Sequence, residues 1–361
     1  MKRALLLAGM ATGMLSDSTA GERLDREQLL QYRNRTGAIV PVTTTADWPM
    51  RRTETVRAME AIMGPLPIEK RVPLRIAVHQ ETDCGSYVRR EISYQAEPGA
   101  RVPAFLLMPK AVAEGREKRP AVLALMPTNA TDGNRAVVGL GSAGGKPGRN
   151  YGEELVQRGF VVIVPPYPHL GDYKPDLRNL GYASGTMKAI WDNVRALDVL
   201  DETAGIAKVG YAAIGHSLGG HNSIYTAVFD SRITVIVSSC GFDSYLDYYK
   251  ERPQMWRDGR GWTQDRYMPR LAAYADRLED IPFDFHELIS ALAPRPFLTL
   301  SPKGDANFKW ESVARILDAV RPVYALHDAT ERLAVEHPDC VHDFPPEMRE
   351  AAYRWIERWL K

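Results

Sequence analysis

The chain has 361 residues, with 46 Lys and Arg against 45 Asp and Glu, 45% apolar residues and 25% charged residues. These values are typical of a folded globular protein and exclude intrinsic disorder as the main state. A formal charge of +1, with no block of five or more basic residues, argues against nucleic acid or an anionic membrane as the partner and favours a small molecule.

The first twenty residues resemble a secretory signal peptide. Met1-Lys2-Arg3 is basic, residues 4–15 are mostly apolar, and Ser18-Thr19-Ala20 offers small residues for cleavage. Two glycines and a threonine interrupt the apolar region, and Asp17 lies close to the cut, so an uncleaved N-terminal segment remains the alternative. We expect export to the periplasm or beyond if residues 1–20 are a signal peptide, and a cytoplasmic location if they are not.

Residues 21–73 predict a helical N-terminal appendage. Asp47 is a suitable N-cap, Pro49 suits the first turn, and apolar residues between 56 and 63 recur at helical spacing. The run Gly64-Pro65-Leu66-Pro67 then ends the helix.

From residue 74 to the C-terminus the pattern predicts one catalytic domain. Residues 87–94 and 102–108 are apolar or alternating runs separated by a turn at 97–99, which predicts an antiparallel hairpin. Short apolar strands then alternate with helical segments, which indicates an α/β fold with a mainly parallel sheet and helices on both faces. The predicted segments are 121–126, 151–158, 160–164, 185–200, 209–214, 218–229, 233–238, 297–300, 310–320, 323–326 and 346–360, with 323–326 a strand.

Residues 242–286 interrupt this alternation. The segment contains three residues assigned to a substrate pocket, Trp256, Trp262 and Tyr267, within a run rich in aromatic and charged residues that has no strand pattern. It is too long for an ordinary loop. We expect a helical, aromatic lid over a pocket; the alternative is a surface pair of helices packed on the sheet edge.

The strongest motif is Gly215-His216-Ser217-Leu218-Gly219, which follows an apolar strand and precedes a helix. The Gly-x-Ser-x-Gly pattern in this context predicts a sharp turn that presents Ser217 as a nucleophile. The start of the following helix offers the Leu218 N–H to a developing oxyanion. His216, beside the nucleophile, is assigned to the substrate pocket.

A serine nucleophile needs a base and an acid, in the chain order Ser, acid, His. His342 lies in the loop before the last helix and is the predicted base, with His337 as its rival. Asp305 follows the strand 297–300 and is the predicted acid. The alternatives for the acid are Glu311 and Asp343.

The second oxyanion donor is expected after the first central strand. Pro127 has no N–H, so Thr128 is the first choice and Asn129 the second.

A Gly-x-Gly-x-x-Gly match at 139–144 predicts a loop and not a nucleotide site, because Lys146-Pro147-Gly148 stands where the phosphate-binding helix should start. Cys84, Cys240 and Cys340 are too few and scattered for a disulfide framework. We therefore predict free or buried thiols, with no metal site and no cofactor. The longest apolar run is far below the ~18 residues that span a bilayer, so no membrane partner is expected.

With these motifs the chain resembles the α/β-hydrolase superfamily. Within it, the chain is similar to secreted bacterial acetyl-xylan-esterase-like and dienelactone-hydrolase-like proteins, related to single-domain members of the prolyl oligopeptidase family. The likeness runs from about Tyr32 to the C-terminus, although Met126-Pro127 stands where many relatives have His-Gly. The motifs that carry it are at 215–222, 239–242, 265–269, 293–296, 305–308 and 342–345.

The triad and the resemblance together predict a serine carboxylesterase that acts on short acyl esters, such as acetyl groups on carbohydrate. A peptidase of the prolyl oligopeptidase type is one alternative, since the same triad cleaves amides. A catalytically silent hydrolase fold used for binding is the other. The oligomeric state is left open.

Overall fold

The computed structural model describes residues 23–142, 146 and 148–361. The candidate signal peptide at 1–20 lies outside these residues. No helix in the described part of the chain is both long enough and apolar enough to cross a membrane.

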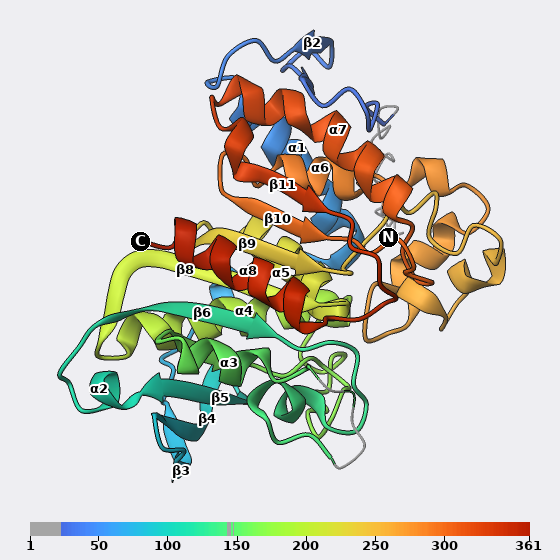
Figure 1. Cartoon of the computed structure of the whole chain (residues 1–361). Helices are drawn as coiled ribbons and strands as arrows, with labels where there is room; N and C mark the ends of the chain where they lie inside the picture. The colour runs from blue at the N-terminus through green and yellow to red at the C-terminus, as the bar shows by residue number, and fades with distance from the viewer. Residues whose placement is uncertain (1–22, 143–145, 147) are drawn as a thin grey trace, which may run out of the picture.

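A nine-stranded sheet forms the centre of the described residues (Figure 1), in the order β11-β10-β9-β8-β6-β7-β5-β4-β3. The strands from β6 onward pair in parallel, while β3, β4 and β5 form an antiparallel meander whose last strand runs antiparallel to β7. This is the predicted α/β architecture, including the predicted hairpin of β4 and β5. The strands are β3 Ala77–Asp83, β4 Tyr87–Glu97, β5 Ala100–Pro109, β6 Arg119–Leu125, β7 Val161–Val164, β8 Ile206–His216, β9 Ile233–Ser239, β10 Phe297–Leu300 and β11 Leu333–Glu336.

The helices cover both faces of the sheet, as predicted. In Figure 1, α3 and α8 lie in front of the sheet and α4 and α5 behind it. Both α4 and α5 are almost entirely buried. The buried residues of α4 include charged side chains that form ion pairs within the helix, Lys188 with Asp192 and Arg195 with Asp198. The helices are α1 Trp48–Met63, α2 Lys110–Ala113, α3 Tyr151–Gln157, α4 Gly185–Glu202, α5 Leu218–Phe229, α6 Phe285–Ser290, α7 Trp310–Leu326 and α8 Pro346–Trp359.

The register of the parallel strands aligns their carboxyl ends. Leu125 of β6 pairs with Gly215 of β8, and the next residue, His216, pairs with Ser239 of β9. Ser239 in turn pairs with Leu300 of β10. The loops that follow these four strands therefore start side by side at one edge of the sheet, where α/β proteins place their ligands.

The prediction for the segment after Val320 was wrong. Residues 323–326 are the last turn of α7, which continues through Pro322, and not a strand. Val323 and Tyr324 are buried against the core, which offsets the backbone hydrogen bond that proline cannot make. The edge strand is instead β11, a short run that the sequence analysis did not identify.

The N-terminal segment contains a small hairpin that was not predicted, β1 Gln31–Arg33 with β2 Ile39–Pro41. The predicted helix α1 follows and ends before Gly64, and its apolar residues join the core. Asp47 occupies the N-cap position, but its side chain accepts hydrogen bonds from the preceding Thr43 and Thr44 and caps no helical N–H.

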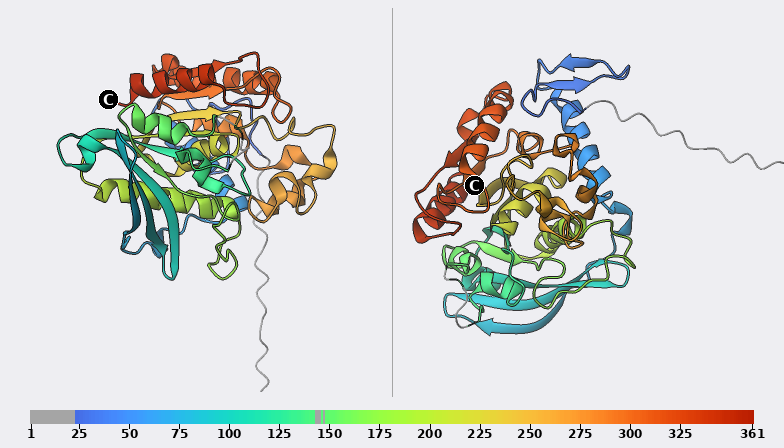
Figure 2. Two further views of the ribbon diagram at one scale, coloured as in Figure 1. Left: turned by 60° about the horizontal axis from the view of Figure 1, so that its bottom comes forward. Right: turned by 90° about the vertical axis from the view of Figure 1, so that its right-hand side faces the viewer.

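The insertion at 242–286, all of which the structure describes, contains no strand and only short helical turns until α6 begins. Figure 2 shows it at the side of the molecule, projecting beyond the sheet. Its 3-10 helices are η3 Pro253–Trp256, η4 Gly261–Thr263, η5 Pro269–Tyr274 and η6 Leu278–Asp280; the others in the described residues are η1 Ile68–Lys70, η2 Gly133–Val138 and η7 Thr330–Arg332.

Candidate active site

Ser217 occupies a strained turn between β8 and α5. Its backbone has φ 55° and ψ −121°, a region that L residues rarely adopt. A Cβ atom on Gly215 would lie 2.2 Å from the carbonyl carbon of Gly219, and one on Gly219 would lie 2.0 Å from the carbonyl oxygen of Leu125. Both glycines are thus required by close backbone contacts, as the motif predicts.

His342 lies between Ser217 and Asp305. Its Nε2 is 3.0 Å from the Ser217 Oγ, and its Nδ1 is 2.8 Å from the Asp305 Oδ2. The other carboxylate oxygen of Asp305 accepts hydrogen bonds from the N–H groups of Asn307 and Phe308, at 2.7 and 3.1 Å. The structure therefore brings together the three residues that the sequence singled out, from loops after β8, β10 and β11.

The alternative base and acids lie elsewhere. His337 follows β11 directly, but its Nδ1 is 2.9 Å from the carbonyl oxygen of Ser301 and its ring packs against Trp310. Glu311 is exposed on the first turn of α7. Asp343 forms an ion pair with Arg149 at 2.7 Å; burial opposes its ionisation, but the guanidinium outweighs this and holds the pKa of the carboxyl below its usual range.

Two cavities meet at Ser217 and Thr128. The larger, of about 550 Å³ and here called the polar cavity, is lined mainly by polar groups that include Asn129, Asp132, Arg149, Glu153, His216 and His342. The smaller, of about 190 Å³ and here called the aromatic cavity, is lined by residues that include Tyr248, Trp262, Gln264, Tyr267, Asn307 and Phe308. The insertion supplies most of the aromatic wall.

Three of the four residues assigned to a substrate pocket line a cavity, and one does not. Trp262 and Tyr267 line the aromatic cavity, and His216 lines the polar cavity. Trp256 lines neither: it is 1% exposed, packs edge-on against two tyrosines, and its indole N–H donates to the carbonyl oxygen of Tyr248. The prediction for Trp256 was wrong because an aromatic insertion needs a core of its own.

His216 is buried beneath the base. Its ring lies 5.0 Å from that of His342 and stacks on Phe344 at 5.7 Å. Burial, helped by the nearby Arg149 charge, places the pKa of His216 well below its ordinary value, so its imidazole is neutral. The ring of His216 therefore packs as a neutral group against those of His342 and Phe344.

The candidate oxyanion donors come from two different segments of the chain, and both line the aromatic cavity together with Ser217. Leu218 is the first residue of α5, where helical geometry leaves the first N–H groups without an intrahelical partner. Thr128 lies in the loop after β6, with its hydroxyl 3.4 Å from the Tyr267 hydroxyl. The side chain of Asn129 folds back to accept hydrogen bonds from the Thr131 and Asp132 N–H groups, which shapes this loop.

Sequence reasoning missed a stacked aromatic layer behind the aromatic cavity. His221, four residues after the nucleophile on α5, is sandwiched between Tyr225 at 4.1 Å and Trp262 at 4.2 Å. Burial lowers the pKa of His221 to about 3, so the ring is neutral. The spacing of Ser217, His221 and Tyr225 along one face of α5 was the available signal.

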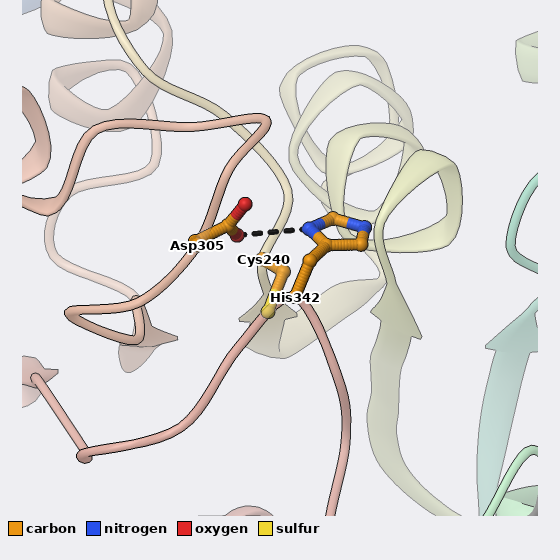
Figure 3. Close-up of side chains that lie close together, drawn as sticks. All are labelled: Cys240, Asp305 and His342. Carbon is orange, nitrogen blue, oxygen red and sulfur yellow. Dashed lines mark hydrogen bonds and ion pairs between the residues drawn. The ribbon is translucent and has the colours of Figure 1, made fainter.

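The thiol of Cys240 also lies at the acid and base. Its Sγ, a carboxylate oxygen of Asp305 and a ring nitrogen of His342 lie within 4.8 Å of one another (Figure 3), and its S–H donates to the Asp343 carbonyl oxygen at 3.4 Å. Burial, and then the Asp305 charge, raise the pKa of this thiol. The sequence pattern does not predict this cluster.

The glycine-rich motif at 139–144 does not follow a strand. The residues just before it form η2, and Gly139 ends that 3-10 helix with φ 77°. Residues 143–145 lie outside the described part of the chain.

Comparison with known proteins gives a consistent set of hydrolases. A family model described as "Glucuronyl esterase, fungi" matches residues 176–327, which include Ser217 and Asp305. The putative hydrolase YtaP of Bacillus subtilis (strain 168) is 27% identical over 218 residues, which cover 58% of this chain and 69% of that protein.

Solved structures of esterases share the fold. A glucuronoyl esterase from Solibacter usitatus has a TM-score of 0.72 and 20% identity, covering 93% of this chain and 98% of its own. Acetyl xylan esterase 1 from Thermoanaerobacterium sp. JW/SL YS485 has a TM-score of 0.55 and 14% identity, covering 93% and 98%. Together with the sheet order and the turn at Ser217, these likenesses show that the chain has the α/β-hydrolase fold.

Proposed function

We propose that the protein is a serine esterase that hydrolyses ester groups on carbohydrate, with Ser217 as nucleophile, His342 as base and Asp305 as acid. The observation that carries the proposal is the placement of His342, which joins the Ser217 hydroxyl and the Asp305 carboxylate by hydrogen bonds of 3.0 and 2.8 Å. The relatives named above are esterases or a hydrolase, which supports ester cleavage over peptide cleavage.

In this mechanism the Ser217 Oγ attacks the ester carbonyl while its proton passes to the Nε2 of His342. Asp305 fixes the ring with its proton on Nδ1 and stabilises the imidazolium. The Leu218 N–H and Thr128 bind the oxyanion. His342 then protonates the leaving alcohol, and in the second half of the reaction it activates the water that releases the acid.

The ester itself has two candidates, which differ in where the sugar lies. In an acetyl ester of xylan the sugar is the alcohol, and the acyl group needs little space. In a glucuronoyl ester the sugar is the acyl group, and the family model favours this second candidate. The aromatic cavity, with ring faces and the amides of Gln264 and Asn307 beside Ser217, has the composition of a site for one sugar ring.

Hydrolysis of p-nitrophenyl acetate tests the mechanism. Ser217→Ala is expected to lower kcat by about 10⁴-fold or more, because the covalent route is lost. Ser86→Ala, an exposed hydroxyl in the turn between β3 and β4, is the matched control. Equal turnover by the wild type and Ser217→Ala would disprove the proposal, and failure of a fluorophosphonate to label Ser217 in the wild type would support the silent-fold alternative.

A substrate panel distinguishes the acetyl esterase, the glucuronoyl esterase and the peptidase. Acetylated xylan, a methyl ester of glucuronic acid and a peptide p-nitroanilide are compared at equal enzyme concentration by kcat/KM. Preference for acetylated xylan supports the acetyl assignment, and preference for the uronic acid ester supports the second candidate. Preference for the anilide would favour a peptidase.

A further inference from the structure

We propose that Zn²⁺ binds among Cys240, Asp305 and His342 and inhibits the enzyme. The inhibition rests on the function proposed above, whereas the binding site rests only on the three side chains. A thiolate, a carboxylate and an imidazole are the donor types that zinc takes in proteins, and three protein ligands with one open position form a recurrent zinc arrangement.

The geometry is close to that of a zinc site. The three donor atoms lie within 4.8 Å of one another, and the Nδ1 of His342 is 2.8 Å from the Oδ2 of Asp305. Tetrahedral bonds of ~2.0–2.3 Å require donor separations of about 3.3–3.6 Å. The imidazole and carboxylate therefore have to part by about 0.5 Å, and the sulfur has to approach them by about 1.3 Å at most.

Neighbouring groups hold two of the ligands in place. The Oδ1 of Asp305 is fixed by the N–H groups of Asn307 and Phe308, which leaves Oδ2 directed at His342. The hydroxyl of Ser239 lies 3.8 Å from the Cys240 sulfur and is placed to donate to a thiolate there. Such outer partners orient the ligands of a metal and raise their basicity.

The site is largely closed in this structure. Cys240 is 2% exposed and the Asp305 side chain 1%, whereas the His342 side chain is 17% exposed and lines the polar cavity. An ion reaching the sulfur has to displace the hydrogen bond between Asp305 and His342. Inhibition is therefore expected to develop with time after mixing, and a chelator is expected to reverse it.

Proton balance explains why an ion here stops catalysis. Coordination displaces the proton of the Cys240 thiol to solvent and forms a sulfur–zinc bond. The proton on the Nδ1 of His342 must also leave, and it is replaced by one on Nε2 when the ring changes tautomer. The Nε2 atom then carries a proton, which it donates to the Ser217 hydroxyl in a hydrogen bond, and it can no longer accept the Ser217 proton. The base is therefore lost while the serine stays in place.

Two measurements on the full-length protein test the site. A Co²⁺ titration reads binding through the thiolate-to-metal charge-transfer band and needs no activity. Zn²⁺ inhibition of p-nitrophenyl acetate hydrolysis, relative to each protein's own zinc-free rate, reads the consequence. The variants are Cys240→Ser and Cys240→Ala, with Cys84→Ser as the matched control, because Cys84 is a partly buried free thiol in the turn between β3 and β4.

The wild type and Cys84→Ser are expected to show the Co²⁺ band and slow, EDTA-reversible inhibition. Both Cys240 variants should lose the band and need at least tenfold more Zn²⁺ for half inhibition, since even outer-shell changes weaken metal binding ~10–100-fold. Unchanged sensitivity of both Cys240 variants, or no band in the wild type, would overturn the proposal. If the protein lacks esterase activity, the Co²⁺ titration alone still decides the binding site.

Discussion

The loops that hold Ser217, Asp305 and His342 differ from the insertion at 242–286 in what fixes them. Each of the first two loops leaves a central parallel strand, and backbone hydrogen bonds tie them together: the Ser217 N–H donates to Ser239, and the Cys240 N–H to Leu300. The insertion has no strand, and edge-to-face ring contacts with turn hydrogen bonds hold its short helices. The sheet therefore fixes the side chains of the proposed triad, whereas ring packing fixes the wall of the aromatic cavity.

Because of this difference, we expect substitutions at the strand ends and substitutions in the insertion to have different effects. Changes at the strand ends act on reacting atoms or on the fold as a whole, because the same backbone contacts serve both. Changes in the insertion act on the aromatic wall and leave the triad geometry in place.

The largest effect is expected for Asp305→Asn, which keeps the shape of the side chain but removes its charge. An amide at this position favours the wrong tautomer of His342 and cannot stabilise the imidazolium, so kcat should fall by about 10⁴-fold with little change in KM. Steady-state hydrolysis of p-nitrophenyl acetate measures both constants. Glu311→Gln, an exposed carboxylate on α7, is the control, and a loss below tenfold for Asp305→Asn would remove Asp305 from the mechanism.

Gly219→Ala, the second change at the strand ends, is expected to lower the free energy of unfolding. On an unobstructed helix this change stabilises by about 1 kcal/mol. Here the new Cβ would lie 2.0 Å from the Leu125 carbonyl oxygen, so the backbone of β6 or α5 has to move, which costs about 1–3 kcal/mol. Urea denaturation measures the free energy of unfolding. A neutral or stabilising result would show that the close contact between α5 and β6 is absent.

The strand ends were also the part of the molecule that the sequence predicts best. The Gly-x-Ser-x-Gly motif between an apolar strand and a helix predicted Ser217 as nucleophile, and the order of strands predicted Asp305 and His342 as its partners; the structure brings these three side chains within hydrogen-bond distance. These predictions depend on local pattern and chain order alone. The edge of the sheet was harder, because β11 is only four residues long and α7 continues through a proline that usually ends a helix.

The insertion could not be predicted in the same detail. Its aromatic residues have no periodicity that separates Trp256, which packs inside the insertion, from Trp262, which lines the cavity. The approach of Cys240 to Asp305 and His342 depends on the register of β9 and β10, which a single sequence does not reveal. Contacts between segments distant in sequence thus account for most of what was missed.

The stack of Tyr225, His221 and Trp262, which joins α5 to the insertion, predicts that the stability of the fold depends on pH. Burial lowers the pKa of His221 to about 3, against an unfolded value near 6.5, so only the unfolded chain takes up this proton between those values. The contribution of His221 is present above pH 6.5 and is lost as the pH falls, by about 2 kcal/mol between pH 7 and pH 5.

His221→Phe keeps a flat ring between Tyr225 and Trp262 but cannot be protonated. The unfolding free energy of this variant should therefore fall by about 2 kcal/mol less than that of the wild type between pH 7 and pH 5, as measured in urea. His79→Phe, a change at an exposed histidine, serves as the control. Equal pH dependence in wild type and His221→Phe would mean that His221 is not held neutral by burial.

The smallest effect is expected for Tyr267→Phe in the aromatic wall. The Tyr267 hydroxyl lies 3.4 Å from that of Thr128, a long and weak hydrogen bond, and its loss should lower kcat/KM by about two- to fivefold. Tyr274→Phe, at the end of η5 in the same insertion, is the matched control. Because the hydroxyl touches the loop of a proposed oxyanion donor and not the triad, the change should leave labelling of Ser217 by a fluorophosphonate intact. A loss of 100-fold or more would instead make Tyr267 a direct partner of the reacting atoms, and the insertion would then belong to the catalytic frame and not only to the wall.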